Sequence, residues 1–347
     1  MIRVSRGAEP RSLQLERRRR LSRAMLERQA GKASKALDFT GYGVVKEELA
    51  EALNRKCVFC EMALRPQGSP VEHFRPKALV ANKGEPPDVN RYWWLAWTWE
   101  NLLFACDRCN NSPYKGNQFP LAPGTMALPE GSFNLATEQP LLIDPATVDP
   151  RDHLRFKWSR SEGRWVPVPV NGSTLGKKTI EILGLDQDEK PTKHILERVE
   201  PLMEQIEEAI RGQEPAAIQR TWSRMLQSLF SRGQPFHAVT WDALDDRFPE
   251  PVRRAWGLSL PRLGSHQQPP PGLPVFEDPP EFSHLSEVVQ LRVRALGQNA
   301  PWEEVKDIFS DVLQMRSWTD DELARLFERQ PDTIRHYRRR LTSPSPP

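Results

Sequence analysis

Four cysteines form two C-x-x-C pairs whose spacing could hold a metal ion. The chain contains four cysteines in all, Cys57 and Cys60 in CVFC, and Cys106 and Cys109 in CDRC. Two such pairs with no cysteine left over are typical of a structural Zn²⁺ site, in which four thiolates close a tetrahedral shell. Two disulfides or four unrelated thiols are the alternatives. We predict a structural zinc that pins two segments together, with a long insertion between the pairs.

The insertion contains VEHFRPK (71–77), whose residue types suit the hydrolysis of a phosphodiester. That reaction needs a base for water, a cation on the scissile phosphate, and positive charge that holds the backbone. His73 is largely neutral near pH 7 and can take a proton from water. Glu72 and Asn110 offer hard oxygen ligands for Mg²⁺ or Mn²⁺, and the Asn101 amide can hold the base or its loop. The phosphate-facing charges are expected on Arg75, Lys77 and Lys115.

Taken together, these motifs resemble the HNH endonuclease family with its ββα-metal fold. The shared pattern is C-x-x-C, an acidic residue followed by His, then Asn-Leu, then C-x-x-C-Asn and a Lys. The chain is most similar to HNH proteins of bacterial anti-phage systems, namely Septu-type (PtuB-like) nuclease subunits and retron-associated effectors. The similar segments are CVFCE, VEHFRPK, WENLLFACDRCNNSPYKGNQFPL and LLIDPATVDPRDHLRF, and the resemblance spans residues 1–235.

The resemblance implies a metal-dependent DNA endonuclease controlled by a separate ATPase subunit. By position, His73 becomes the general base and Asn101 the middle residue of the motif, while Glu72 and Asn110 become the catalytic metal-binding pair. Glu72 stands where many HNH proteins have Asp, and Asn110 where others have His. Because an amide is a weak ligand for soft metals, Mg²⁺ or Mn²⁺ is favoured over Zn²⁺ or Ni²⁺. Asn111 is an alternative to Asn110.

Two other functions fit many of the same residues. An RNA-directed HNH nuclease, acting for example on tRNA, would use the same metal site because the scissile group is the same. A non-catalytic zinc module that binds DNA or protein would explain the cysteines but would leave Glu72, His73 and Asn101 without a reason. The chain has no G-x-x-x-x-G-K-[ST] phosphate loop, so any dependence on ATP is expected to come from the other subunit.

The elements that must position these residues predict an α+β fold. We expect a ββα-metal core with a four-cysteine structural zinc site, surrounded by helices and followed by a mainly helical C-terminal region. The expected divisions are an N-terminal helical segment (1–56), the nuclease domain (57–150), a hairpin and helical region (151–240), a proline-rich linker (241–282) and a C-terminal helical region (283–347).

Apolar spacing predicts helices over 9–30 and 43–56, and a helical region over 177–233 that is our candidate surface for the ATPase. The four arginines at 17–20 favour a solvated face over a phosphate-facing patch. The segment GRWVPVPVNGSTLGKKT predicts a hairpin with Asn171-Gly172 as its turn signal. Most of the five aromatic residues between 92 and 99 are expected to pack against the zinc module rather than to stack on bases.

The C-terminal segment WTDDELARLFERQPDTIRHYRRRLT predicts two short helices, the first opened by a Thr319–Glu322 capping box. In the second helix, Ile334, Tyr337 and Leu341 face inward. Four arginines face outward, of which the first three are the predicted nucleic-acid contacts: Arg335, Arg338, Arg339 and Arg340. A helix-turn-helix that reads DNA and a helical hairpin that binds protein both fit.

Composition sets the limits of these expectations. The chain has 347 residues, of which 38% are hydrophobic and 27% charged, which is ordinary for a soluble protein. Its formal net charge is only +3, so a nucleic-acid surface requires local clustering of basic residues. Without a run of about 18 apolar residues or an apolar stretch behind MIRVSRGAEPRS, we expect no membrane span and a cytoplasmic protein.

Overall fold

The computed structural model describes residues 1–264, 278–296 and 300–342. These residues form two compact units, each of which gathers segments that are distant in sequence. The first unit comprises the described residues of Met1–Ala8, Lys46–Tyr92 and Glu100–Pro270, and the second those of Glu9–Val45, Trp93–Trp99 and Pro271–Pro347. Within the described residues, no helix is long and apolar enough to cross a membrane.

A small antiparallel sheet carries the predicted site in the first unit. Strand β1 (Val71–His73) pairs with β2 (Leu102–Phe104), in a register that sets His73 opposite Leu102. Every residue of both strands is buried. The short helix α3 (Asp107–Asn110) follows β2, so the chain runs strand, strand, helix through the segment that contains the predicted chemistry.

A second antiparallel sheet corrects the predicted hairpin. Strand β3 (Leu154–Ser159) pairs with β4 (Arg164–Pro169), and residues 160–163 connect them. Asn171 and Gly172, expected at the hairpin turn, instead follow β4 with φ angles of 47° and 72°. This left-handed pair leads the chain into helix α4 (Thr174–Leu183), so Asn171-Gly172 forms a turn, as predicted, but the turn joins β4 to a helix and not to a second strand.

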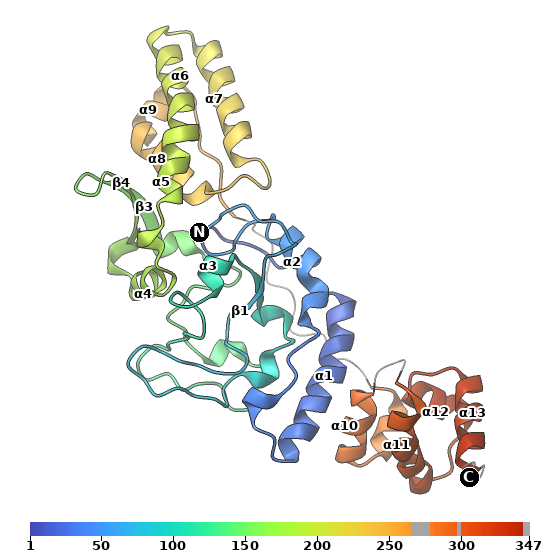
Figure 1. The fold of residues 1–347 in the computed structure, drawn as a ribbon. Coiled ribbons are helices and arrows are strands. Elements are labelled where there is room, and N and C mark those ends of the chain that lie inside the picture. Colours follow the sequence, from blue (N-terminus) through green and yellow to red (C-terminus); the bar gives the residue numbers. More distant parts are fainter. Residues whose placement is uncertain (265–277, 297–299, 343–347) are drawn as a thin grey trace. The chain divides into compact units, whose positions relative to one another are not determined.

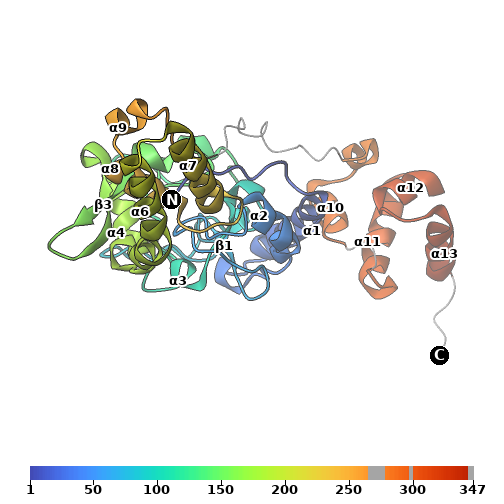
Figure 2. The same ribbon diagram turned by 90° about the horizontal axis from the view of Figure 1, so that it is seen from above.

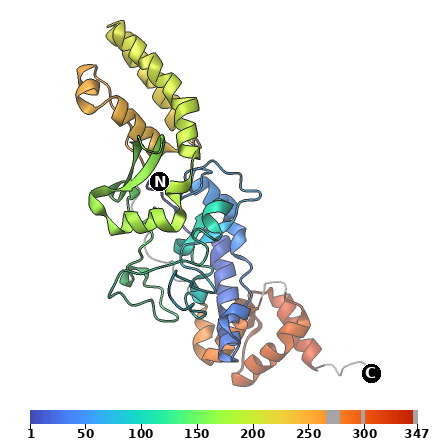
Figure 3. The same ribbon diagram turned by 60° about the vertical axis from the view of Figure 1, so that its left-hand side comes forward.

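Helices complete the first unit: α2 (Lys46–Ala52), α4 (Thr174–Leu183), α5 (Lys190–His194), α6 (Glu200–Arg211), α7 (Pro215–Phe230), α8 (His237–Arg247) and α9 (Glu250–Ala255). A single π-type turn, Ile195–Val199, joins α5 to α6. Helices α6 and α7 lie side by side and antiparallel (Figures 1 and 3). Their apolar faces share a core with α8 that includes Ile206, Trp222 and Leu244. The helical prediction for 177–233 is confirmed.

Two predicted boundaries in this unit are wrong. Residues 241–258 do not belong to a linker, because Leu244, Phe248 and Leu258 are part of the helical core. The rest of that predicted linker lies largely outside the described residues, at 265–277. The helix expected to run to residue 56 ends at Ala52, because Asn54 and Arg55 adopt left-handed φ angles of 56° and 52° that reverse the chain toward the first cysteine pair.

The second unit is helical in its described residues, with α1 (Arg11–Gln29), α10 (Glu287–Ala295), α11 (Trp302–Met315), α12 (Asp320–Leu326) and α13 (Pro331–Thr342). Helices α11, α12 and α13 pack around buried Phe309, and Figure 2 shows them as one group. The Thr319–Glu322 capping box is confirmed. Ile334 and Tyr337 face the core as predicted, but Leu341 is 37% exposed and does not.

The predictions for the arginine run at 17–20 and for the aromatic run at 92–99 have different outcomes. The side chains of residues 17–20 are partly buried and engaged in ion pairs, for example Arg18 with Asp278 and Arg19 with Glu16, so the solvated face is wrong. The aromatic run is buried, because five residues are at most 3% exposed: Tyr92, Trp93, Trp94, Trp97 and Trp99. Tyr92 belongs to the first unit with the cysteines, but Trp93–Trp99 belong to the second, so packing of the whole run against the zinc module is not confirmed.

Candidate functional site

The four cysteines meet at one point, as the paired spacing predicts. Their sulfur atoms all lie within 4.8 Å of one another: Cys57, Cys60, Cys106 and Cys109. The first pair sits in a tight turn in which Glu61 N–H donates to the Cys57 carbonyl at 2.9 Å. The second pair caps α3, since Cys106 Sγ accepts from Cys109 N–H at 3.4 Å. Four thiols in this arrangement could hold a metal such as zinc.

The cysteine cluster is tied directly to the small sheet. Val58 N–H, inside the first pair, donates to the Phe104 carbonyl at the end of β2 at 3.0 Å. Hydrogen bonding with Cys106 and Cys109 raises the pKa of the Cys60 thiol well above its ordinary value. A bound cation would favour the thiolate forms and relieve this crowding. A metal here would therefore brace the strand opposite His73.

Glu72 and His73 are both buried in β1, with exposures of 5% and 4%. As consecutive strand residues they project to opposite faces. Lys115 bridges them, because its Nζ pairs with the Glu72 carboxylate and donates to the His73 carbonyl at 2.9 Å. Burial raises the pKa of Glu72, and the charge of Lys115 opposes that rise. On the other side, Lys77 Nζ lies 3.4 Å from His73 Nδ1.

Asn101 fixes the loop that follows His73. Its Oδ1 accepts from Arg75 N–H at 2.7 Å, while its Nδ2 donates to the Arg75 carbonyl at 3.0 Å. The Asn101 carbonyl also accepts from Phe74 N–H at 2.9 Å, which continues the pairing of the two strands. Asn101 is 0% exposed, so these bonds do not compete with water. This is the loop-holding arrangement that the sequence led us to expect of this residue.

A buried network that the sequence did not reveal supports the same loop. Arg75 Nε donates to Glu138 Oε2 at 2.8 Å, and Tyr92 Oη donates to Glu138 Oε1. Leu128 N–H donates to the same Oε1 at 3.1 Å. Burial raises the pKa of Tyr92 far above its ordinary value, and its hydrogen bond to Glu138 adds to the effect, so the phenol stays a donor. The partners are 63 and 46 residues apart, and no local pattern signals them.

Two of the three predicted phosphate contacts near His73 lie inside the protein. Lys115 is 0% exposed and Arg75 is 4% exposed, and each is paired with a buried carboxylate. Because those charges are already used internally, we infer that neither contacts a substrate directly. Lys77 is partly exposed and lies beside His73, and its contact with phosphate stays a prediction.

Asn110, the predicted second ligand of the catalytic metal, is the last residue of α3. It is partly buried, and its Nδ2 lies 3.4 Å from Oδ1 of the alternative ligand Asn111. Across the described residues, the four-cysteine cluster is the only group of three or more His, Cys, Asp or Glu side chains placed to hold a metal. The roles of Glu72 and Asn110 toward Mg²⁺ or Mn²⁺ therefore stay predictions.

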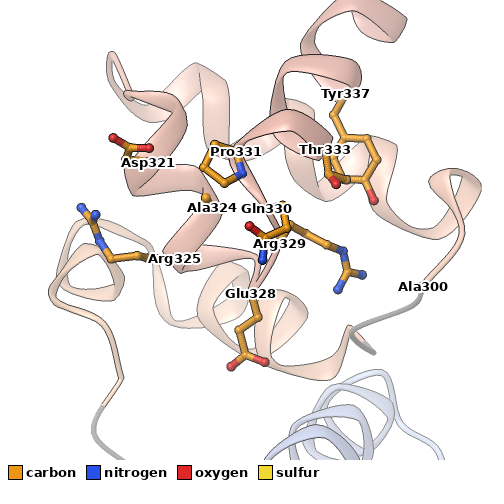
Figure 4. Close-up of a pocket in the computed structure, with 10 residues that line it drawn as sticks. All are labelled: Ala300, Asp321, Ala324, Arg325, Glu328, Arg329, Gln330, Pro331, Thr333 and Tyr337. Atoms are coloured by element: carbon orange, nitrogen blue, oxygen red, sulfur yellow. The ribbon is translucent and has the colours of Figure 1, made fainter.

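The predicted arginine contacts of α13 lie in the second unit. Arg335 and Arg339 are exposed, whereas Arg338 donates to Asp320 at 2.8 Å and to the Trp318 carbonyl. A shallow pocket of about 810 Å³ lies between α12 and α13 (Figure 4). Its lining includes Asp321, Arg325 and Tyr337 but none of the three predicted arginines.

Comparison with known proteins places the chain in a family. It is 31% identical over 259 residues to the Septu protein PtuB of Bacillus mycoides (strain KBAB4), covering 67% of this chain and 81% of that protein. The chain belongs to the Septu PtuB family. It is also 28% identical over 151 residues to the Septu protein PtuB of Bacillus thuringiensis, covering 42% of this chain and 43% of that protein. No family model and no solved structure matches the chain. The resemblance to PtuB-like proteins is thus confirmed.

Proposed function

We propose that this Septu PtuB family member is a metal-dependent HNH endonuclease that hydrolyses DNA phosphodiester bonds in bacterial anti-phage defence. The observation that carries the proposal is the double hydrogen bond from the Asn101 amide to the Arg75 main chain, two residues after His73. A zinc module without catalysis has no need to clamp that loop. The strand order β1, β2, α3 and the cysteine cluster at its end are consistent with the ββα-metal core.

In the proposed reaction, His73 takes a proton from a water molecule, which attacks the scissile phosphate in line with the leaving oxygen. Lys77 is the nearby cation best placed to meet the phosphate, because it is partly exposed and lies beside His73. Lys115 serves a different purpose, since it neutralises Glu72 and holds the His73 carbonyl.

The donor chemistry of Glu72 and Asn110 fits a hard cation, because both offer oxygen ligands. The Glu72 carboxylate is buried and paired with Lys115, so a metal would have to share or displace that ammonium. Asn110 is partly exposed, and its amide is engaged only by a long contact with Asn111. A Mg²⁺ or Mn²⁺ ion held by these two residues would stabilise negative charge on the scissile phosphate. The cysteines would hold a structural Zn²⁺ that takes no part in the chemistry.

A separate ATPase is the proposed controlling partner, as the membership of the Septu PtuB family suggests. The chain carries no phosphate loop of its own, so any dependence on ATP would come from that subunit. We propose the helical region 177–233, which contains the α6–α7 pair, as its docking surface. The exposed arginines of α13 are the proposed second contact with nucleic acid. If removal of 265–347 abolished ATPase binding, docking would belong to the C-terminal region instead.

The test is a cleavage assay on supercoiled plasmid, single-stranded DNA and tRNA with Mg²⁺, Mn²⁺ or EDTA. Wild type is compared with His73→Ala and with the matched control His284→Ala, which changes an exposed histidine of the second unit. Loss of a positioned base typically costs about 10²–10⁴ in rate. We expect metal-dependent cutting by wild type and His284→Ala, and loss of cutting by His73→Ala with its zinc retained.

The same assay is repeated with the partner ATPase. Cutting by His73→Ala at the wild-type rate would exclude the proposed base. Absence of cutting by wild type both alone and with the ATPase would exclude the nuclease. Cutting of tRNA but not of DNA would replace the substrate while keeping the site.

A further inference from the structure

A cavity of about 570 Å³ lies in the first unit, and none of the proposed catalytic residues lines it. Its wall is formed by the N-terminal segment 2–7, the end of α2, the chain around the start of α8, and residues 261–264. Cavities of this volume are common ligand pockets. Apolar contacts come from residues such as Phe230, Pro261 and Leu263. The charged lining residues are four arginines and one carboxylate: Arg3, Arg6, Arg232, Arg262 and Glu51.

The arginines of the cavity are only partly neutralised. Arg6 pairs with Asp144 at 2.9 Å, and Arg232 pairs with Glu51 at 2.8 Å. Arg3 and Arg262 also line the cavity, and among the described residues neither guanidinium group has a hydrogen bond or an ion pair. Two positive charges in this cavity therefore lack a counterion within the described chain.

His237 adds a buried donor that points to the same kind of ligand. It lines the cavity while being only 8% exposed, and its Nδ1 lies 3.2 Å from Lys56 Nζ. Lys56 lies 4.0 Å from Glu61 and is an ammonium in that pair, so it can only donate to Nδ1. The proton of the neutral imidazole then sits on Nε2, as an N–H donor.

That Nε2 is buried and has no hydrogen-bond partner among the residues that the structure describes. Burial and the charge of Lys56 lower the pKa of His237 to about 4, so the ring is neutral at pH 7. The main chain of Ser231 acts in the opposite direction and raises the pKa of His237, but it forms no hydrogen bond with Nε2 by distance and angle. Buried donors without an acceptor are uncommon in native proteins. The missing group is therefore an acceptor, and the two free guanidinium groups indicate that it is negatively charged.

We propose that this cavity binds the phosphate groups of a nucleotide-sized ligand through Arg3, Arg262 and the Nε2–H of His237. Guanidinium groups match the oxygens of phosphate in charge and in planar donor geometry. The ring of Phe230 with Pro261 and Leu263 offers the apolar surface against which a nucleoside can pack. The proposal does not depend on the nuclease activity, since it concerns different residues and a binding reaction.

The experiment is isothermal titration calorimetry on the full zinc-loaded chain in phosphate-free buffer. The probes are ATP, inorganic pyrophosphate, adenosine, and a short oligonucleotide with or without a 5′-phosphate. The variants are Arg262→Ala and Arg3→Ala. Arg160→Ala is the matched control, because Arg160 is exposed, lies outside the cavity and has no ion pair among the described residues.

We expect saturable binding of ATP and pyrophosphate, and none of adenosine. Loss of one charged hydrogen bond should weaken binding about tenfold to a hundredfold in Arg262→Ala and Arg3→Ala, with no change in Arg160→Ala. If the 5′-phosphorylated oligonucleotide is the only probe that binds, and both arginine variants weaken that binding, the phosphate site stands and its ligand is the 5′ end of a nucleic-acid strand. Absence of binding by every phosphate probe, or equal affinity in wild type and both variants, overturns the proposal.

Discussion

The buried ion pair between Arg75 and Glu138 supports the loop that follows His73, and a substitution of Glu138 tests that role. In Glu138→Gln the side chain keeps its shape but loses its charge. The glutamate accepts from three donors, the Arg75 Nε, the Tyr92 hydroxyl and the Leu128 N–H. A glutamine has one oxygen and one NH₂ group. In either amide orientation, its NH₂ faces the Arg75 Nε–H or the Leu128 N–H, which are themselves donors.

The expected loss of stability in Glu138→Gln depends on how deeply the ion pair is buried. The Arg75 and Glu138 side chains are 5% and 0% exposed, so water cannot replace the lost charge. Removing one partner of a buried ion pair typically costs about 3–5 kcal/mol. For a unit of roughly 200 residues, this corresponds to a fall in the melting temperature of about 6–20 °C.

The assay is thermal unfolding by calorimetry, combined with hydrogen exchange of the Arg75 amide that Asn101 binds. We expect faster exchange at this amide under conditions in which the protein is still folded. Glu250→Gln is the matched control, because Glu250 pairs with Arg254 while both side chains are largely exposed, and it should leave unfolding unchanged.

A double variant separates the buried charge from a general loss of packing. Arg75→Met with Glu138→Gln removes both charges and keeps an oxygen that accepts from the Tyr92 hydroxyl and the Leu128 N–H, and it should be more stable than Glu138→Gln alone. Wild-type stability in Glu138→Gln, or a double variant less stable than the single one, would refute the reasoning.

Three further predictions concern the metal, the second buried pair and pH. Removal of zinc by a chelator, or the substitution Cys109→Ser, should lower thermal stability. Elemental analysis should find about one zinc per wild-type chain. A metal-free wild type that is as stable as the metal-bound protein would contradict the cysteine site. Lys115→Met leaves Glu72 buried without its cation and should cost about 3–5 kcal/mol of unfolding free energy, whereas Lys77→Met should cost much less. The pKa of His237 is about 4 in the folded protein, below its usual value near 6.5, so folding favours the neutral ring. The stabilisation that neutral His237 contributes is therefore complete above pH ~6.5 and is lost as pH falls toward 4. The free energy of unfolding should fall by about 2–3 kcal/mol over that range. Denaturant unfolding between pH 4 and 7 should show this slope in wild type and a flatter one in His237→Asn; identical slopes would contradict it.

Local chemistry accounts for what could be predicted from the sequence. Two C-x-x-C pairs identify a four-cysteine cluster because each tight turn brings its own two sulfurs together. The Thr319–Glu322 capping box lies within one helical turn, and apolar spacing marks the helices of 177–233. Each of these signals lies within a few residues of the group it describes.

The incorrect predictions concern residues whose structural partners are not evident from neighbouring sequence. Asn171-Gly172 has the expected turn conformation, but the partner of β4 turned out to be β3, which precedes it. Arg75 and Lys115 look like surface cations in the sequence, because charge alone does not report burial. Their counterions are Glu138, 63 residues away, and Glu72, which is itself buried in a strand.

The sequence by itself determined which cysteines form the cluster, the order of the helices and the residue types available beside His73. Only the tertiary structure decided which of those residues are buried and paired in support of the loop and which are partly exposed. The physical reason is that a charged side chain can be buried only when a specific partner offsets its loss of hydration. That partner is supplied by the folded chain and not by neighbouring residues.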